Sequence, residues 1–297
     1  MESVTVIVPA RNAEKTIHLA AQSILRVLPD SGRMLVYDDA SEDGTSKILE
    51  RIARADRRVG ILTSRANVGV ATALNTLIDA AETPLIARMD ADDISLPWRF
   101  RHQLSALYRG DLDVVFASII MFGKKRKLVQ PQAPFAVSPD ASSYELLLVN
   151  TLPHPTLLGR RSTFARVGGY RDVPAEDWDL WIRMALEGIR LGRVAMPDLL
   201  YRRHPQQASA NKDWRSAHAA QAHDDLCRRL IGVSSSGAFA GLSGPSAEPF
   251  ELEAAIRLVD TVDRVGKSFA SFTDRLSMRR TVWLAKHRLN QVYGAQV

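Results

Sequence analysis

Residues 85–93 read Leu-Ile-Ala-Arg-Met-Asp-Ala-Asp-Asp, a short apolar run that ends in the carboxylates of Asp90, Asp92 and Asp93. A buried strand followed by a turn produces this pattern. Because the three acids repel one another, the cluster needs either water or a cation around it. Carboxylate oxygens suit Mg²⁺ or Mn²⁺, which also bind phosphates. The spacing leaves two interpretations: a metal site that grips a diphosphate, or a solvated turn before a helix with Asp93 or Ser95 as its N-cap.

The residues before this stretch alternate between strand and helix patterns. The expected order is strand 4–8, helix 13–27, strand 33–37, helix 46–54, strand 58–63, helix 70–81 and then the strand at residue 85. Strands connected through helices lie parallel, and the helices cover the faces of the sheet. Ligands bind at the carboxyl ends of such strands, where the polar loops of this chain fall. The sequence therefore predicts an α/β fold with a mostly parallel sheet.

The rest of the chain is less regular and ends in helices. The expected elements are a helix that starts within 96–99 and runs to about 108, strand 113–122, a basic hairpin or loop at 123–127, helix 143–149, edge strand 156–159, helix 162–167, helix 180–187, and strands 191–194 and 199–203. An amphipathic helix is expected up to 231, a Gly/Ser/Ala/Pro-rich connection at 232–249, and helix from 251 onward. We therefore predict a domain at 1–212 and a helical appendage at 213–297.

The composition is typical of an ordinary soluble globular protein. The chain has 297 residues, 46% of them hydrophobic and 24% charged. The single cysteine, Cys227, excludes an intrachain disulfide and fits a reducing compartment. The first residues lack the basic and apolar regions of a secretion signal. The sequence contains no run of 18 apolar residues, so we expect no membrane-spanning helix. We expect a cytoplasmic protein.

The net charge of +6 is placed unevenly along the chain. Residues 257–297 hold eight Lys or Arg and three Asp, so this segment supplies +5. Such a tail can be a solvated helix face, a contact for the anionic inner face of a membrane, or a surface for homo-oligomer formation. We expect no nucleic-acid partner.

Two common phosphate-binding loops are absent from the sequence. The loop Pro9–Asn12 after the first strand has no glycine, so the dinucleotide-binding fingerprint is missing. Gly266-Lys267-Ser268 resembles the end of a P-loop, but Thr261 stands where that loop needs glycine. Any nucleotide must therefore be held in another way.

Four motifs occur in a fixed order: residues 6–12 (VIVPARN), 36–45 (VYDDASEDGT), 67–69 (NVG) with 73–75 (ALN), and 90–93 (DADD). This ordered set resembles family 2 glycosyltransferases, which have the GT-A fold, a Rossmann-like nucleotide-binding sheet. Later segments at 155–156, 168–170, 176–178 and 201–204 are similar to that family too. The resemblance covers roughly residues 3–210 and does not extend to the tail after residue 212.

The resemblance implies a nucleotide-sugar site at the carboxyl edge of the sheet. Its residues would be Pro9, Arg11, Asn12, Asp38, Asp39, Arg65, Asn67, Gly69, Asp90, Ala91 and Asp92. Asp39 would accept the uracil N3–H, whereas Asp38 would hold the loop or form an Asx turn. Arg11 stands where the family often has an aromatic residue, and a guanidinium can also stack on a base. Arg65 would contact the diphosphate or Asp92, and Asn67 and Gly69 would shape their loop.

The resemblance also implies a metal site and a general base. Asp90-Ala91-Asp92 resembles the family's DXD motif: Asp92 would bind Mg²⁺ or Mn²⁺, and Asp90 would reach the ribose or a metal-bound water. His204 would be a third ligand or a diphosphate contact, with a hydrogen-bonded loop histidine as the alternative. Asp177 would take the proton of the acceptor hydroxyl, unless it serves only as the N-cap of the next helix.

Three residues are expected near the acceptor: Glu176, which orients Asp177 or binds acceptor, and more weakly Trp178 and His154. The chain lacks the Gln-x-x-Arg-Trp motif of the processive members of the family. We therefore expect an inverting, non-processive glycosyltransferase that uses a nucleotide-sugar donor, UDP-linked by preference, and a glycan or lipid-linked acceptor. The alternatives are a sugar-phosphate nucleotidyltransferase and a non-catalytic glycan-binding protein of the same fold.

Overall fold

The computed structural model describes residues 3–109, 112–123, 126–132, 134–203, 217–235, 237–238, 242 and 249–293. The chain forms two compact units. The first comprises Met1–Pro134, Pro153–Asp172 and Val194–His204, and the second comprises Phe135–Leu152, Val173–Arg193 and Pro205–Val297. These units interleave along the sequence, and the boundary expected near residue 212 stays a prediction.

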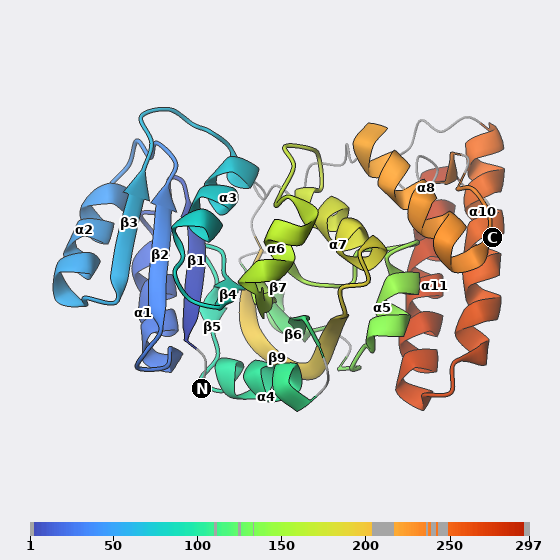
Figure 1. The fold of residues 1–297 in the computed structure, drawn as a ribbon, viewed down its shortest axis with the longest axis horizontal. Helices are drawn as coiled ribbons and strands as arrows, with labels where there is room; N and C mark the ends of the chain where they lie inside the picture. The colour runs from blue at the N-terminus through green and yellow to red at the C-terminus, as the bar shows by residue number, and fades with distance from the viewer. Residues whose placement is uncertain are drawn as a thin grey trace. The chain divides into compact units, whose positions relative to one another are not determined.

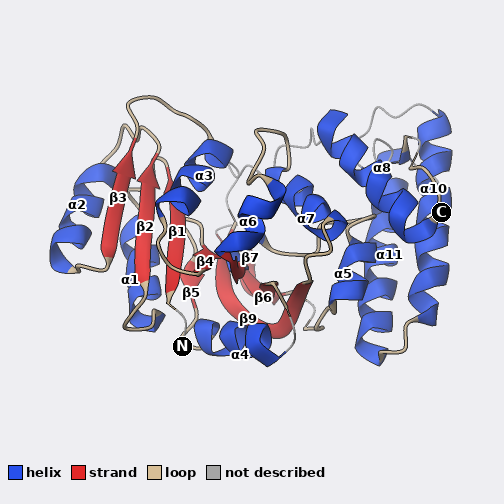
Figure 2. Ribbon diagram, viewed as in Figure 1, coloured by secondary structure: helices blue, strands red, loops and turns tan. Residues whose placement is uncertain are grey.

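A mixed sheet of nine strands is formed by the described residues (Figures 1 and 2). Its order is β3-β2-β1-β4-β8-β6-β9-β5, with β7 beside β6. The strands are β1 (Val4–Ala10), β2 (Arg33–Asp38), β3 (Val59–Thr63), β4 (Leu85–Arg88), β5 (Ile94–Ser95), β6 (Val114–Gly123), β7 (Arg126–Pro131), β8 (Leu158–Arg160) and β9 (Leu191–Arg202). β3, β2, β1 and β4 are parallel, as their helical crossovers require. β8 then pairs antiparallel with both β4 and β6.

Helices cover both faces of this sheet (Figure 1). In the first unit they are α1 (Ile17–Val27), α2 (Thr45–Ala55), α3 (Val70–Ala80), α4 (Arg99–Arg109), α6 (Arg161–Val167) and the 3₁₀ turn η1 (His154–Thr156). Each crossover helix has one apolar stripe; in α1 the buried positions Ile17, Ala20, Ala21 and Ile24 recur at helical spacing. The predicted β-α-β order up to β4 is therefore present.

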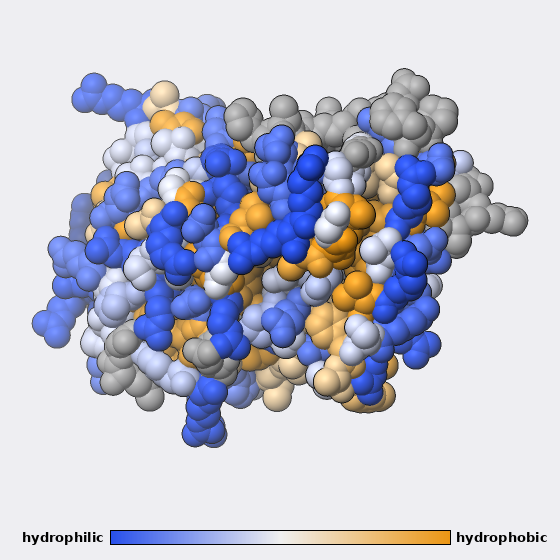
Figure 3. All heavy atoms as spheres, turned by 45° about the vertical axis from the view of Figure 1, so that its right-hand side comes forward, coloured by the Kyte–Doolittle hydropathy of each residue, from blue (hydrophilic) through white to orange (hydrophobic). Residues whose placement is uncertain are grey.

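The second unit is mainly helical. Its helices are α5 (Pro139–Glu145), α7 (Glu176–Leu186), α8 (Ala217–Ile231), α10 (Pro249–Ser268) and α11 (Phe272–Tyr293). Fully buried Glu145 accepts hydrogen bonds from the hydroxyls of Thr151 and Ser277, each at 2.5 Å, and so ties α5 to α11. Figure 3 brings these C-terminal helices forward and shows hydrophobic as well as hydrophilic residues on their surface. Within the described ranges, no helix is long and apolar enough to cross a membrane.

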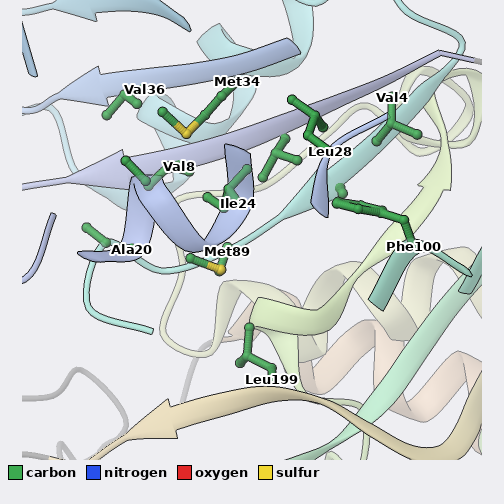
Figure 4. Packing of buried hydrophobic residues seen from close by; sticks show 14 of the residues in the cluster. Val4, Val8, Ala20, Ile24, Leu28, Met34, Val36, Met89, Phe100 and Leu199 are labelled. Atoms are coloured by element: carbon green, nitrogen blue, oxygen red, sulfur yellow. The ribbon is translucent and has the colours of Figure 1, made fainter. Parts of the chain in front are cut away.

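The apolar core of the first unit lies between α1 and the parallel strands (Figure 4). Val8 of β1, Met34 and Val36 of β2, and Met89 after β4 are at most 1% exposed and meet the buried side of α1 at Ile24. Burying each such side chain contributes about 1.5–3 kcal/mol. This packing fixes the strand ends, and with them the polar loops that follow.

Several element boundaries differ from the expectation: α1 begins at 17 rather than 13, β8 covers 158–160 rather than 156–159, and the helix expected from 251 onward is divided into α10 and α11. Three further differences have a local physical reason. α5 occupies 139–145 rather than 143–149, because Pro139 suits a first helical turn and Ser138 caps it by accepting from the Ala141 amide. β9 is one strand rather than two, since the fixed φ of Pro197 is compatible with extended backbone. α7 begins at Glu176 rather than at 180, and its acidic first turn favours that start.

A buried histidine makes the stability of the second unit dependent on pH. His223 of α8 is 0% exposed and donates from Nε2 to the Leu147 carbonyl at 2.9 Å. Burial lowers its pKa to about 4 from the ordinary value of 6.5. Because the unfolded chain takes up this proton first, the contribution of neutral His223 is present above pH 6.5 and is lost as the pH falls toward 4.

We expect the free energy of unfolding to fall by about 2 kcal/mol between pH 7 and pH 5 through this group. Urea unfolding at both pH values measures it. His223→Gln keeps a donor for Leu147 but does not titrate, so its pH dependence over this range should be smaller by that amount. Equal pH dependence in the two proteins would contradict the assignment.

Candidate active site

The carboxyl end of β2 carries two buried aspartates that organise neighbouring loops. Asp38 is 3% exposed and accepts hydrogen bonds from the Ser41 amide at 3.2 Å and from the Ser46 hydroxyl. Asp39 is 6% exposed and accepts from the amides of Val68 and Gly69, at 2.8 and 3.1 Å, and from the Ser64 hydroxyl. Asp38 thus fixes the loop after its own strand, whereas Asp39 fixes the loop after β3. The predicted contact of Asp39 with a base would be made by a carboxylate that is already oriented.

The loop after β1 is tied to the loop after β2 by Asn12. Pro9 lies within β1, and Arg11 is exposed. The Asn12 amide donates to Ser41 Oγ and its Oδ1 accepts from the Glu42 amide, both at 2.9 Å. Asn12 has φ 50°, a left-handed conformation that asparagine tolerates better than most residues. Asn12 therefore shapes this loop, and exposed Arg11 is the side chain that it presents to solvent.

The loop between β3 and α3 contains the next predicted residues. Arg65 and Asn67 are exposed. The Asn67 side chain accepts from the Gly69 amide at 3.1 Å, and Gly69 has φ 83°, which favours glycine. Asn67 and Gly69 thus determine the loop conformation, which leaves Arg65 as the charged side chain available there for a ligand.

Asp90, Asp92 and Asp93 form a compact acidic corner directly after β4. One carboxylate oxygen of each lies within 4.8 Å of the others. Ala91 between them is buried. Arg202 of β9 closes the corner: its amide donates to Asp93 Oδ1 and its Nε to the Asp92 carbonyl, both at 2.8 Å. The N-cap interpretation of Asp93 and Ser95 is wrong, because Ser95 lies in β5 and α4 begins only at Arg99.

Arg88, at the end of β4, pairs with one carboxylate of this corner. Its Nη1 and Nη2 lie 2.8 and 2.5 Å from the two oxygens of Asp90, and its side chain is 5% exposed. This bidentate pair orients Asp90 and offsets one of the three negative charges. Sequence reasoning missed Arg88; its position inside an apolar run was the available signal, since a buried cation needs a partner.

The acidic corner fits a divalent cation. Asp93 is 1% exposed, and its Oδ2 has no hydrogen-bond partner within the described part of the chain. Burial, followed by the nearby Asp90 carboxylate, holds the pKa of Asp93 well above its ordinary value. A buried carboxylate oxygen without a donor, grouped with two further carboxylates, is suited to Mg²⁺ or Mn²⁺. The third predicted ligand, His204, lies outside the described residues.

A second buried arginine supports the corner from α4. Arg99 is 0% exposed and donates from Nη2 to the carbonyl oxygens of Arg88 and Pro155, at 2.7 and 3.2 Å. Its Nε donates to Gln103, and Gln103 donates in turn to the Thr156 carbonyl. Burial lowers the pKa of Arg99 to about 10. The signal in the sequence was a charged residue on the apolar stripe of an amphipathic helix.

His154 and the 168–170 loop meet α3. His154 is buried, and its Nε2 lies 2.8 Å from the Tyr170 hydroxyl. Burial, followed by the Arg88 charge, lowers the pKa of His154 well below 6.5, so the ring is neutral. Asn75 Oδ1 accepts from the Tyr170 amide and its Nδ2 donates to the Tyr170 carbonyl, both at 2.8 Å. Two motifs that are far apart in the sequence are thus joined by one side chain.

Gly169 makes this junction possible, and we expect Gly169→Ala to lower the free energy of unfolding by about 3 kcal/mol. Gly169 has φ 70°, and an added Cβ would lie 2.5 Å from Asn75 Oδ1, so both strain and lost hydrogen bonds follow. Gly168→Ala is the matched control: φ is 73°, but nothing lies within 4 Å of the added Cβ, so about 1–2 kcal/mol is expected. Urea unfolding of both variants measures the difference, and equal losses would contradict it.

The candidate base belongs to the second unit. Asp177 is in the first turn of α7; its Oδ2 accepts from Asn150 Nδ2 at 2.9 Å and its Oδ1 from the Trp178 amide at 2.7 Å. The N-cap of α7 is Ala175, so the interpretation of Asp177 as an N-cap is wrong. Glu176 precedes Asp177 in the same turn and is half-buried. The hydrogen bonds from Asn150 and the Trp178 amide fix the orientation of the carboxylate that would act as the base.

Trp178 lies inside the second unit rather than on a surface. It is 2% exposed, and its Nε1 donates to the Leu146 carbonyl at 3.0 Å. Its burial argues against the expected contact of Trp178 with an acceptor. Trp181 is 0% exposed and belongs to the core, as do the other residues of α7 from 178 to 185, which are all buried.

Comparisons with known proteins define the class and then the family. The fold is similar to that of Staphylococcus aureus TarS 1-349, crystallised with UDP-GlcNAc: the TM-score is 0.61 at 20% identity, and the alignment covers 99% of this chain and 92% of the TarS 1-349 chain. The fold is therefore that of a GT-A glycosyltransferase. The sequence model of Glycosyl transferase family 2 matches residues 5–167, and the chain belongs to this family. The resemblance inferred from the ordered motifs is confirmed.

Two relatives illustrate the relationship. EpsE of Bacillus subtilis (strain 168) is 30% identical over 198 residues, which are 63% of this chain and 68% of EpsE. An Escherichia coli protein named UDP-Glc:alpha-D-GlcNAc-diphosphoundecaprenol beta-1,3-glucosyltransferase WfaP is 25% identical over 212 residues, 71% of this chain and 82% of WfaP. The protein is thus a glycosyltransferase, as the sequence predicted.

Proposed function

We propose that this glycosyltransferase transfers a sugar from a UDP-sugar to a hydroxyl group of a glycan or lipid-linked acceptor in polysaccharide synthesis, with inversion at the anomeric carbon. The acidic corner after β4 carries this proposal. Asp93 Oδ2 is buried beside two further carboxylates and accepts no hydrogen bond from the residues that the structure describes, so it suits a cation that binds a diphosphate. The name of WfaP, which includes a UDP-sugar and a lipid-linked acceptor, supports the choice of substrates.

Each residue then has a defined task. Asp39 and Arg11 hold the base, and Arg65 contacts the diphosphate. Mg²⁺ or Mn²⁺ would be held by Asp92 and Asp90, with Asp93 and His204 as further donors, and would offset the charge that develops on the leaving diphosphate. Asp177 accepts the proton of the acceptor hydroxyl while the hydroxyl oxygen bonds to C1, and the C1–O bond breaks with its electron pair leaving on UDP. Glu176 orients this base or binds the acceptor.

Donor hydrolysis across a panel of UDP-, GDP- and TDP-sugars, with Mn²⁺ or with EDTA, tests this proposal. We expect release of UDP from one UDP-sugar, with Mn²⁺ and not with EDTA. Formation of a nucleotide sugar from a sugar phosphate and a nucleoside triphosphate, with pyrophosphate release, would instead indicate a nucleotidyltransferase. Sugar binding without any turnover would indicate the glycan-binding alternative.

We also propose a cytoplasmic location at the inner face of the membrane, with peripheral contact through the basic C-terminal helices. The lipid-linked acceptor named for WfaP supports this placement. Self-association through the same helices is the competing role for their charge. Light scattering of the full chain in the absence of lipid separates the two.

A further inference from the structure

The solvent-facing side of α11 presents two large aromatic side chains. Phe272 is 66% exposed and Trp283 is 59% exposed, the highest fractions among large hydrophobic residues in the described ranges. Phe272, Arg279, Trp283 and His287 follow one another at helical spacings of seven, four and four residues, so they lie along one face. The rings of Trp283 and His287 are stacked, with centroids 5.1 Å apart. The other side of the helix is buried at Met278, Val282, Ala285 and Leu289.

The charges of α11 are almost all positive. Its basic residues are Arg275, Arg279, Arg280, Lys286 and Arg288. Its one acidic residue, Asp274, is 6% exposed and faces the interior. The neighbouring helix α10 differs, because there Arg257 pairs with Glu253 at 2.6 Å and Lys267 with Asp263 at 2.7 Å. The exposed face of α11 therefore combines aromatic rings with cations and has no exposed carboxylate of its own.

Two of these cations flank the aromatic residues. The Arg275 guanidinium lies 6.0 Å from the centre of the Phe272 ring. Lys286 reaches Asp260 of α10 at 3.5 Å, with its side chain 33% exposed. Arg279, between Phe272 and Trp283 on the same face, is exposed. Aromatic rings beside long cationic side chains are typical of surfaces that lie at the boundary between lipid headgroups and acyl chains.

We propose that this face of α11, formed by Phe272, Arg275, Arg279, Trp283 and Lys286, docks on an anionic lipid surface. Trp and Phe would enter the headgroup region, and Arg279 would pair with lipid phosphates. A symmetric contact between two copies would bring each cation of the face against the cations of its partner, which is unfavourable. The proposal deepens the membrane contact proposed above by assigning it to α11 rather than to the charge-balanced α10.

Co-sedimentation of the full chain with phosphatidylcholine vesicles, with and without phosphatidylglycerol, tests the proposal. We expect binding only when the anionic lipid is present, and weaker binding as salt is raised. Arg279→Glu should lower the partition coefficient about ten-fold or more, and so should the double variant Phe272→Ala with Trp283→Ala. The assay contains neither donor nor acceptor, so its result is independent of the proposed glycosyl transfer.

Two matched controls define the face. Arg264→Glu reverses an exposed charge on α10, and Leu19→Ala removes an exposed apolar side chain from α1; both should change binding less than about two-fold. Circular dichroism and the melting temperature verify that all variants are folded. Equal losses for Arg264→Glu and Arg279→Glu would overturn the assignment to α11. So would unchanged binding of the double variant, or a dimer in light scattering that Trp283→Ala dissociates while vesicle binding is absent.

Discussion

Asp177→Asn is expected to lower kcat by about 10²- to 10⁴-fold, because the acceptor hydroxyl loses the group that takes its proton. Asparagine has the same shape and keeps one acceptor oxygen, so the contact with the Trp178 amide can persist. The contact with Asn150 persists only if the Asn150 amide turns and gives up its hydrogen bond from the Leu152 amide. Donor binding should change less than about two-fold, since the base faces the acceptor. Steady-state kinetics with the donor identified in the panel gives kcat, and calorimetric titration with UDP gives the affinity.

A neutral substitution at the other end of the same helix serves as the control for Asp177→Asn. Glu187→Gln removes an exposed carboxylate at the C-terminal end of α7 and should retain nearly full activity. The pH profile adds a second readout: if Asp177 is the base, the acidic limb of the kcat profile should disappear in the variant. Full activity of Asp177→Asn would remove this residue from the mechanism and leave Glu176 to be tested in the same way.

Asp92→Asn is expected to lower kcat/KM by at least about 100-fold and to weaken Mn²⁺ binding. The acidic corner would lose one of the carboxylates that hold the cation, and the stabilisation of a leaving diphosphate by such an ion amounts to several kcal/mol. Electron paramagnetic resonance of free Mn²⁺ measures binding without reference to activity. UDP affinity should also become insensitive to Mn²⁺ in the variant.

The control for this variant is Asp30→Asn, which removes an exposed acid from the turn that leads into β2, at the edge of the sheet opposite the acidic corner. It should bind Mn²⁺ and turn over like the unmodified protein. If Asp92→Asn bound Mn²⁺ with unchanged affinity, the acidic corner would not be the metal site, and the preorganised Arg88–Asp90 pair would need another explanation.

Much of the first unit could be predicted from local patterns. Short apolar runs ending in Asp38 and Asp90 marked buried strands and their carboxyl ends, and the order of the motifs indicated the family. The predicted bounds of β9 and α7 were wrong. The sequence predicted two strands where β9 continues through Pro197, although the fixed φ of proline is compatible with extended backbone. It also placed the start of α7 at Leu180 rather than at Glu176.

The roles of several charged residues could not be predicted, since they depend on partners far away in the chain. The Arg99 guanidinium donates to Pro155, 56 positions away, and the Arg202 amide donates to Asp93, 109 positions away. In the sequence, Asn75 is an ordinary position of a predicted helix. In the structure its side-chain amide donates to the carbonyl of Tyr170, 95 positions later, and accepts from the Tyr170 amide. No spacing rule connects such pairs, because loop lengths between elements are free to vary.

The sequence by itself determined the alternation of strands and helices, the acids at the strand ends and the family, because hydrophobic periodicity and short motifs are local properties of the chain. The tertiary structure alone decided which of those acids is paired with an arginine, which is buried with one oxygen that no donor of the described residues reaches, and which fixes a loop. Asp90, Asp92 and Asp93 have nearly the same sequence context, yet Arg88, Arg202 and burial give them different surroundings. Electrostatic roles follow from distance and solvent exclusion, and both are set only when the chain is packed.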